Sequence, residues 1–320
     1  MQTDHFYSLN HFLRERHGEK VLKLSIDGGF TCPNRDGKIS SKGCLFCSER
    51  GSGDFTGYTK GNITAQLREA SHLLEAKWGI NRKYIAYFQA FTNTYDSLDI
   101  LKQKYEEALA FPGVVGLAIA TRPDCLSDEI INYLEALSKR THLWIELGLQ
   151  TIHEDTALLI NRGYNLSVFN EAIEKLTTHQ IETVIHLILG LPNESKEQML
   201  ETARYISHLP IQGVKLHMLH ILDNAPLGKY YEEHPYKLLT EEEYISLIGD
   251  MLSLFPPHFV IHRLTGDGAR NHLIAPLWTI HKKNVLNHMN HYFKTHNIYQ
   301  GLLFCEASNS CSMWKPQNKC

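Results

Sequence analysis

The sequence lacks the features that mark membrane and secreted proteins. No apolar stretch reaches the roughly 18 residues that a membrane-spanning helix needs. Residues 1–20 are polar and charged, without the apolar centre of a signal peptide. These absences predict a cytoplasmic protein that has no membrane partner.

The chain also has little excess charge, and it lacks an even number of cysteines. Its formal net charge is −3, so any contact with RNA must come from a local patch of Lys and Arg. The 320 residues include 7 cysteines, an odd number that does not suit a complete disulfide framework. In a reducing compartment such cysteines indicate metal binding or catalysis.

Short apolar runs alternate with amphipathic stretches over most of the chain. The expected strands are Val21–Ile26, Tyr84–Gln89, Val115–Ala120, Leu143–Leu149, Thr183–Leu189, Val214–Leu219 and Phe259–Arg263. The expected helices are Ile63–Lys77, Leu98–Leu109, Asp128–Leu137, Val168–Thr178, Lys196–His208 and Glu241–Leu254. Strands that alternate with helices are typical of parallel sheets joined by crossovers.

The alternation predicts an α/β fold, a partial (β/α)6-type TIM-like barrel that occupies residues 21–265, after an N-terminal extension of residues 1–20. Residues 266–320 contain a long helical stretch, Pro276 to His296, followed by a cysteine-containing tail. We expect them to form a C-terminal helical extension that packs on the barrel. In barrels of this type the chemistry lies at the C-terminal ends of the strands.

Three cysteines follow the first expected strand. Cys44 and Cys47 are separated by two residues, and Cys32 comes eleven residues before Cys44. Three thiolates leave the fourth iron of a [4Fe-4S] cluster without a protein ligand, and an open position is typical of catalytic metal sites. The loop position and the aromatic Phe46 beside Cys47 favour a cluster.

A structural zinc site is the alternative interpretation of these cysteines. Zinc requires a fourth ligand, for which Cys125, His5 or a cysteine of the C-terminal tail is available. Cys305, Cys311 and Cys320 themselves match no cluster motif.

The cysteine motif resembles the radical S-adenosylmethionine (SAM) superfamily in its Elp3-related branch, and more closely the YhcC/YtqA type. The resemblance covers residues 5–300 and includes Ala120–Asp124 (ATRPD), Glu146–Thr151 (ELGLQT) and Leu189–Pro192 (LGLP). It implies an enzyme in which the cluster cleaves SAM reductively to a 5′-deoxyadenosyl radical. It also implies tRNA wobble uridine as substrate, converted from 5-carboxymethylaminomethyl-(2-thio)uridine to the 5-aminomethyl form.

The resemblance further implies partners, namely an electron donor such as flavodoxin or ferredoxin and a tRNA methyltransferase that acts downstream. Two alternatives stay open. The radical chemistry can act on a small metabolite or a protein side chain, or the protein can be a non-catalytic iron–sulfur or zinc protein.

The resemblance also assigns residues that bind SAM. Relatives hold SAM with a Gln at the end of the fourth strand and an Arg twelve residues later, a spacing that Gln150 and Arg162 share. Arg162 is expected to pair with the SAM carboxylate, which suits a planar guanidinium. His186 stands where relatives often carry a ribose-binding acid. Phe46 completes the cofactor-binding set at the cluster.

At two positions this chain departs from the family pattern, and other residues are then expected to make the contacts with SAM. Many relatives have Glu where this chain has Ala120, so Glu146 on the next strand is the candidate polar contact. The usual Gly-Gly-Glu after the second strand is replaced by Gln89–Thr94. A backbone carbonyl at Gln89 is then expected to receive the SAM amino group.

Lys215 and His217 on the sixth expected strand, with Arg122, are the catalytic candidates. The end of that strand can face substrate, and Arg122 can contact SAM or a substrate phosphate. Core packing or a structural hydrogen bond is the alternative for the first two, and an ordinary salt bridge for Arg122. Asp267 is either a substrate ligand or a turn residue.

Overall fold

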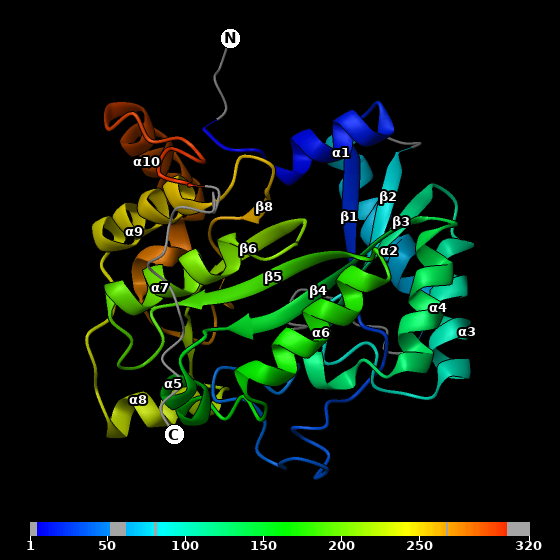
Figure 1. The fold of residues 1–320 in the computed structure, drawn as a ribbon, viewed down its shortest axis with the longest axis horizontal. Helices are drawn as coiled ribbons and strands as arrows, with labels where there is room; N and C mark the ends of the chain where they lie inside the picture. Colours follow the sequence, from blue (N-terminus) through cyan, green and yellow to red (C-terminus); the bar gives the residue numbers. More distant parts are fainter. Residues whose placement is uncertain (1–4, 52–61, 80–81, 267, 306–320) are drawn as a thin grey trace.

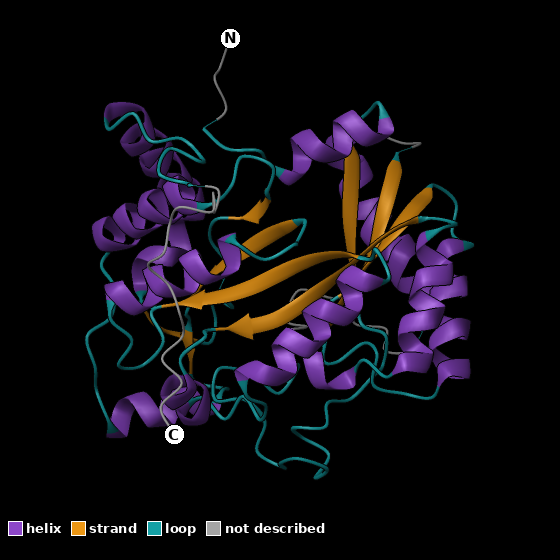
Figure 2. Ribbon diagram, viewed as in Figure 1, coloured by secondary structure: helices purple, strands orange, loops and turns teal. Residues whose placement is uncertain are grey.

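The computed structural model describes residues 5–51, 62–79, 82–266 and 268–305. Seven parallel strands form one curved sheet, in the order β1, β2, β3, β4, β5, β6, β8. Their bounds are β1 (Val21–Ile26), β2 (Lys83–Phe88), β3 (Val114–Thr121), β4 (His142–Gln150), β5 (Glu182–Leu189), β6 (Gly213–Met218) and β8 (Val260–Arg263). Figures 1 and 2 show the strands curling into a partial barrel whose edges are β1 and β8. The expected α/β barrel is confirmed.

Helices cover the outer face of this sheet. They are α2 (Ile63–Trp78), α3 (Leu98–Leu109), α4 (Asp128–Ser138), α6 (Leu166–Thr178), α7 (Lys196–Ser207) and α9 (Glu241–Leu254). Their apolar sides pack with the outward side chains of the strands into the largest core cluster. Two of them, α7 and α9, begin with capping boxes at Ser195 and Thr240, which satisfy backbone N–H groups of the first turn.

Helix α1 (Leu9–His17) covers the inner face of the sheet at the N-terminal ends of the strands. Leu13 is buried there with Val21, Tyr87 and Trp144. The segment before α1 pairs with the far edge of the sheet, since the Ile261 N–H donates to the Tyr7 carbonyl at 2.8 Å. The chain before β1 therefore contacts both edges of the barrel.

The remaining elements lie after β3, after β4 and after β6. They are a 3-10 turn η1 (Pro123–Cys125), α5 (Glu154–Leu159), β7 (Ile221–Leu222), α8 (Pro226–Glu233), β9 (Leu273–Ala275), a 3-10 helix η2 (Leu277–His281) and α10 (Lys282–Thr295). Strand β9 pairs antiparallel with β7, and α10 packs against α9. In the described part of the chain, no helix is both long and apolar enough to cross a membrane.

Candidate active site

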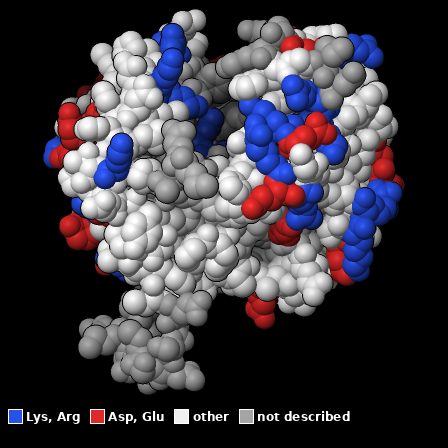
Figure 3. Space-filling model, turned by 90° about the horizontal axis from the view of Figure 1, so that it is seen from above, with Lys and Arg blue, Asp and Glu red and all other residues white. Residues whose placement is uncertain are grey.

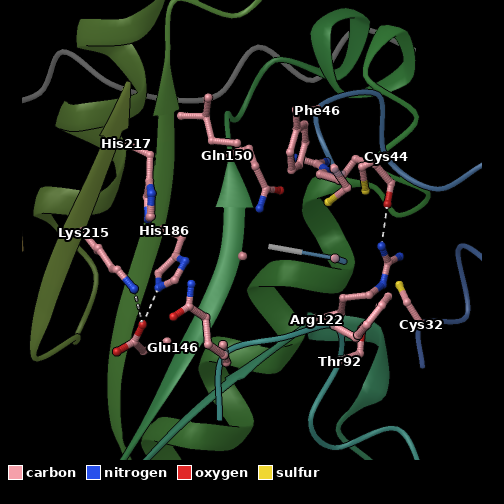
Figure 4. A pocket seen from close by; sticks show the side chains of 18 of the residues that line it. Cys32, Cys44, Phe46, Thr92, Arg122, Glu146, Gln150, His186, Lys215 and His217 are labelled. Atoms are coloured by element: carbon pink, nitrogen blue, oxygen red, sulfur yellow. Dashed lines mark hydrogen bonds and ion pairs between the residues drawn. The ribbon is translucent and has the colours of Figure 1, made fainter. Parts of the chain in front are cut away.

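One cavity brings together the predicted cluster ligands, SAM-binding residues and catalytic candidates. It lies at the C-terminal ends of the strands, and its lining includes Cys32, Cys44, Phe46, Cys47, Gln89, Arg122, Glu146, Gln150, Arg162, His186, Lys215 and His217. Figure 4 shows the cysteines at one end and Lys215 with the two histidines at the other. Gln150, the last residue of β4, lies between the two ends.

The loop that carries the cysteines is fastened to the segment after α5. The Asn34 amide donates to the Cys44 sulfur at 3.3 Å and to the Asn161 carbonyl at 2.7 Å. The Asn161 amide in turn donates to the Gly43 carbonyl at 2.6 Å. These side-chain bonds supply the partners that a loop without regular structure does not supply itself. They hold Cys44 against the end of the barrel.

Two arginines make the surroundings of the cysteines electropositive. The Arg35 guanidinium donates to the carbonyls of Cys47, at 3.0 Å, and Ser48. A hydrogen bond from Cys47 lowers the pKa of Cys44 to about 7, and Arg122, Asn34 and Arg35 shift it in the same direction. Thiolates are the form in which cysteine binds iron.

This arrangement suits an anionic iron–sulfur cluster better than a closed zinc site. Three thiols face one cavity, with an N–H donor directed at one sulfur and cations nearby. The predicted alternatives for a fourth zinc ligand lie elsewhere. Cys125 lines a separate surface cavity, and His5 Nδ1 is 2.8 Å from the Ile298 carbonyl oxygen. Cys305 is exposed, while Cys311, Cys320 and Asp267 lie outside the described residues.

Arg162 is buried and holds the backbone on both sides of Gln150. Its Nη1 donates to the carbonyls of Leu149 at 3.1 Å and Thr151 at 2.6 Å, and its Nε donates to the Tyr164 carbonyl at 2.9 Å. Gln150 has a φ of 65°, a left-handed conformation that costs a non-glycine residue free energy. Arg162 thus stabilises the backbone that presents Gln150, and its pairing with SAM stays a prediction.

Arg122 makes the ordinary salt bridge that was the alternative interpretation, and it lines the cavity as well. It binds Asp124 in bidentate fashion at 2.9 and 2.8 Å, and it donates to the Arg162 carbonyl at 2.9 Å. Its guanidinium carbon also lies 5.0 Å from the centre of the Tyr164 ring. Arg122 therefore links η1 to the segment that carries Arg162.

Glu146 is the centre of a buried polar network at the other end of the cavity. One carboxylate oxygen accepts from Lys23 at 2.8 Å and from Trp144 at 3.1 Å. The other oxygen lies 2.7 Å from both Lys215 Nζ and His186 Nε2. Burial alone raises the pKa of Glu146, but Lys215 and Lys23 hold that pKa well below its usual range.

Three basic groups at this end, Lys215, His186 and His217, are shifted towards their neutral forms. Burial lowers the pKa of Lys215 to about 7, although Glu146 opposes that shift. Burial, with the positive charge of Lys215, lowers the pKa of His186 to about 4. The pKa of His217 is also lowered well below its usual range by burial. His186 and His217 are therefore neutral at pH 7.

Sequence reasoning missed four residues of this network: Lys23, Tyr87, Trp144 and Arg263. Tyr87 accepts from Lys215 Nζ at 2.8 Å, and Arg263 lines the cavity beside it. Lys23 offered a signal, since it is the one charged residue in the mainly apolar first strand. Such a residue in a buried strand needs a buried partner of opposite charge.

Comparison with known proteins identifies the family. Residues 32–206 match the radical SAM superfamily, and residues 211–295 match the radical SAM C-terminal domain. The protein belongs to the radical SAM superfamily. It is thus a radical SAM enzyme, and the cofactors of its family are a [4Fe-4S] cluster and SAM. Cys32, Cys44 and Cys47 are the residues of this cavity that fit such a cluster.

Relatives of this radical SAM enzyme include two bacterial proteins of similar length. YtqA of Bacillus subtilis is 45% identical over 93% of this chain and 92% of its own. YhcC of Escherichia coli K12 is 33% identical over 89% of this chain and 91% of its own. Both confirm the expected YhcC/YtqA type.

Elp3-like proteins are similar over part of their length. A tRNA uridine(34) acetyltransferase of Dehalococcoides mccartyi is 31% identical over 48% of this chain and 33% of its own. The solved structure of Methanocaldococcus infernus Elp3, lacking residues 1–46, superimposes with a TM-score of 0.67 at 17% identity. That match covers 88% of this chain and 64% of the archaeal one, and it shows a shared fold.

Proposed function

We propose that this radical SAM enzyme acts on the wobble uridine of tRNA. In this proposal it converts 5-carboxymethylaminomethyl-(2-thio)uridine to the 5-aminomethyl form. The similarity to a tRNA uridine(34) acetyltransferase, which extends over 157 residues at 31% identity, is the observation that carries the proposal. When bound, the reduced cluster and SAM supply the 5′-deoxyadenosyl radical that such a conversion uses.

The two ends of the cavity suit two different tasks. At the cysteine end, Asn34 and Arg35 hold the loop that would carry the cluster. Gln150 and Phe46 stand beside this end and would contact SAM. At the other end, Lys215 and His217 would face the modified group of the substrate. The walls between them come from neighbouring parallel strands, which fixes their separation.

Contact with RNA would come from a local patch on this nearly neutral protein. Figure 3 shows a hollow in the molecule with Lys and Arg side chains gathered along its edges, beside a few Asp and Glu. Cations along a concave surface attract a polyanion even where net charge is small. Flavodoxin or ferredoxin as electron donor and a downstream tRNA methyltransferase belong to the same proposal, as does a cytoplasmic location.

The proposal is tested by the nucleoside mass profile of total tRNA from cells with and without the gene. In cells without the gene, tRNA is expected to accumulate 5-carboxymethylaminomethyl-(2-thio)uridine and to lose the forms made from it. Restoring the wild-type gene should reverse the change, whereas a Cys44→Ala gene should not. An unchanged profile would overturn the tRNA proposal and would favour a small metabolite or a protein side chain as substrate.

A further inference from the structure

The Lys215 end of the cavity brings three basic side chains together. Lys215 on β6 and Arg263 on β8 are register partners on neighbouring strands, and Lys23 approaches from β1. Among the groups whose charges act on Lys215, Glu146 is the carboxylate, and Lys23 and Arg263 are the cations. Two cations side by side on adjacent strands repel one another, and the repulsion grows where water is excluded.

The histidines at this end do not add charge, but one of them lacks a hydrogen-bond partner. His217 Nε2 is buried without a partner among the described residues, and the His217 side chain lines the cavity. The His217 and His186 rings lie 5.0 Å apart, so His217 stands directly beside the Glu146 network. Buried polar atoms in proteins are normally satisfied, and a ligand is one way to satisfy them.

We propose that this end of the cavity is a subsite for a carboxylate of the substrate. Arg263, and Lys215 in its protonated form, supply the positive charge, and His217 Nε2 supplies a hydrogen bond. Glu146 and Tyr87 position Lys215, because both bind its ammonium group at 2.7 and 2.8 Å. The remaining proton of that ammonium group is available to a ligand.

The inference rests on the proposed function and makes it more specific. The carboxymethylamino group of the proposed substrate ends in a carboxylate, which its product lacks. Binding that carboxylate would hold the adjacent carbon at a fixed place in the cavity. The carboxylate of SAM is expected at the cysteine end, on the far side of Gln150. The two carboxylates would therefore be recognised by different residues.

The test measures binding of N-methylglycine, the smallest mimic of the carboxymethylamino group, to the reconstituted holoenzyme with SAM present. Dimethylamine, which lacks the carboxylate, is the matched probe. Titration calorimetry is carried out with the wild-type protein and with the variants Arg263→Met and His217→Phe. Lys102→Met is the control because it removes one positive charge from an exposed position on the outer helix α3.

The wild-type protein and Lys102→Met are expected to bind N-methylglycine and not dimethylamine. Arg263→Met should weaken that binding roughly tenfold or more, as the loss of a charge-assisted hydrogen bond predicts. His217→Phe should weaken it less. SAM affinity and iron content should stay unchanged in both variants, which also shows that they are folded.

Two results would overturn the subsite. One is equal binding of N-methylglycine and dimethylamine by the wild-type protein. The other is loss of SAM affinity in Arg263→Met with N-methylglycine binding intact, which would assign these cations to SAM. Failure of the tRNA proposal looks different: selective N-methylglycine binding would persist while the nucleoside profile of the deletion strain stays unchanged.

Discussion

At the residue scale, Glu146 is the centre of the buried polar contacts in this cavity. It is 1% exposed and accepts hydrogen bonds from Lys23, Lys215, His186 and Trp144. Removing one partner of a buried ion pair leaves the others uncompensated, which is costly. The barrel interior therefore depends on this one carboxylate.

Glu146→Gln is expected to lower the free energy of unfolding by about 3–5 kcal/mol. The amide keeps the shape but leaves Lys23 and Lys215 facing each other without a counter-charge. Urea unfolding of the cluster-free protein measures the change. Glu135→Gln, which breaks an exposed pair with Lys139 on α4, is the control and should have little effect. Equal unfolding midpoints for both variants would contradict the role given to Glu146.

Asn34 is expected to set the reduction potential of the cluster. Its amide donates to the Cys44 sulfur at 3.3 Å, and such bonds stabilise the more negative, reduced state. Asn34→Ala should keep the iron content but make the potential more negative. A redox titration followed by electron paramagnetic resonance measures this. An unchanged potential would show that the bond to sulfur has no such effect.

The cysteines could be identified from sequence because their spacing is local, whereas the Glu146 network could not. Lys23, Glu146 and Lys215 lie on β1, β4 and β6, so only the curling of the sheet brings them together. A sequence pattern shows that each is a polar residue in an apolar strand. It does not show which of them pair across the barrel.

At the scale of elements, α1 is the part that sequence patterns described least well. The expected extension of residues 1–20 contains a helix that begins at the Ser8 cap and ends at Gly18, which has a φ of 75°. Most of its residues are polar, and Leu13 is its one buried residue, so its apolar periodicity is weak. The seven strands of the barrel sheet, with their apolar runs, were predicted within one residue at each end, whereas the short strands β7 and β9 were not predicted.

Leu13→Ala tests whether α1 stabilises the barrel. Leu13 is 3% exposed inside the inner cluster, so its truncation should cost about 2–5 kcal/mol of unfolding free energy. Thermal or urea unfolding measures this. Leu158→Ala, at a position that is 77% exposed, is the control and should change little. If both variants unfold alike, α1 does not pack as described.

Glu194, in the loop after β5, is expected to make the free energy of unfolding depend on pH. Burial raises the pKa of Glu194 to about 7, from an ordinary value of 4.5. The folded protein therefore binds more protons than the unfolded chain between these values. Stability from this group is present below pH 4.5 and is lost as the pH rises through 7.

Glu194→Gln should remove that loss. Unfolding free energies of the wild-type protein and the variant, compared at pH 5 and 7.5, measure it. Wild-type stability should fall relative to the variant on going to the higher pH. A constant difference between the two proteins would show that Glu194 titrates normally.

At the scale of the whole molecule, the fold explains why distant motifs form one site. Parallel strands place their C-terminal ends at the same edge of the sheet, so loops after β1, β3, β4, β5 and β6 converge there. The order of strands therefore predicted that these loops meet, whereas the individual SAM-binding candidates came from the family resemblance. The substrate could not be predicted in the same way. Its recognition depends on how side chains pair inside the barrel, and the order of strands does not determine that pairing.

Turnover of purified tRNA tests the central claim most directly. tRNA from cells that lack the gene is incubated anaerobically with the reconstituted protein, SAM and a reductant, with Cys44→Ala as the control. We predict that the wild-type protein alone forms 5′-deoxyadenosine while 5-carboxymethylaminomethyl-(2-thio)uridine is converted to the 5-aminomethyl form. Formation of 5′-deoxyadenosine with no change in the wobble uridine would contradict the account.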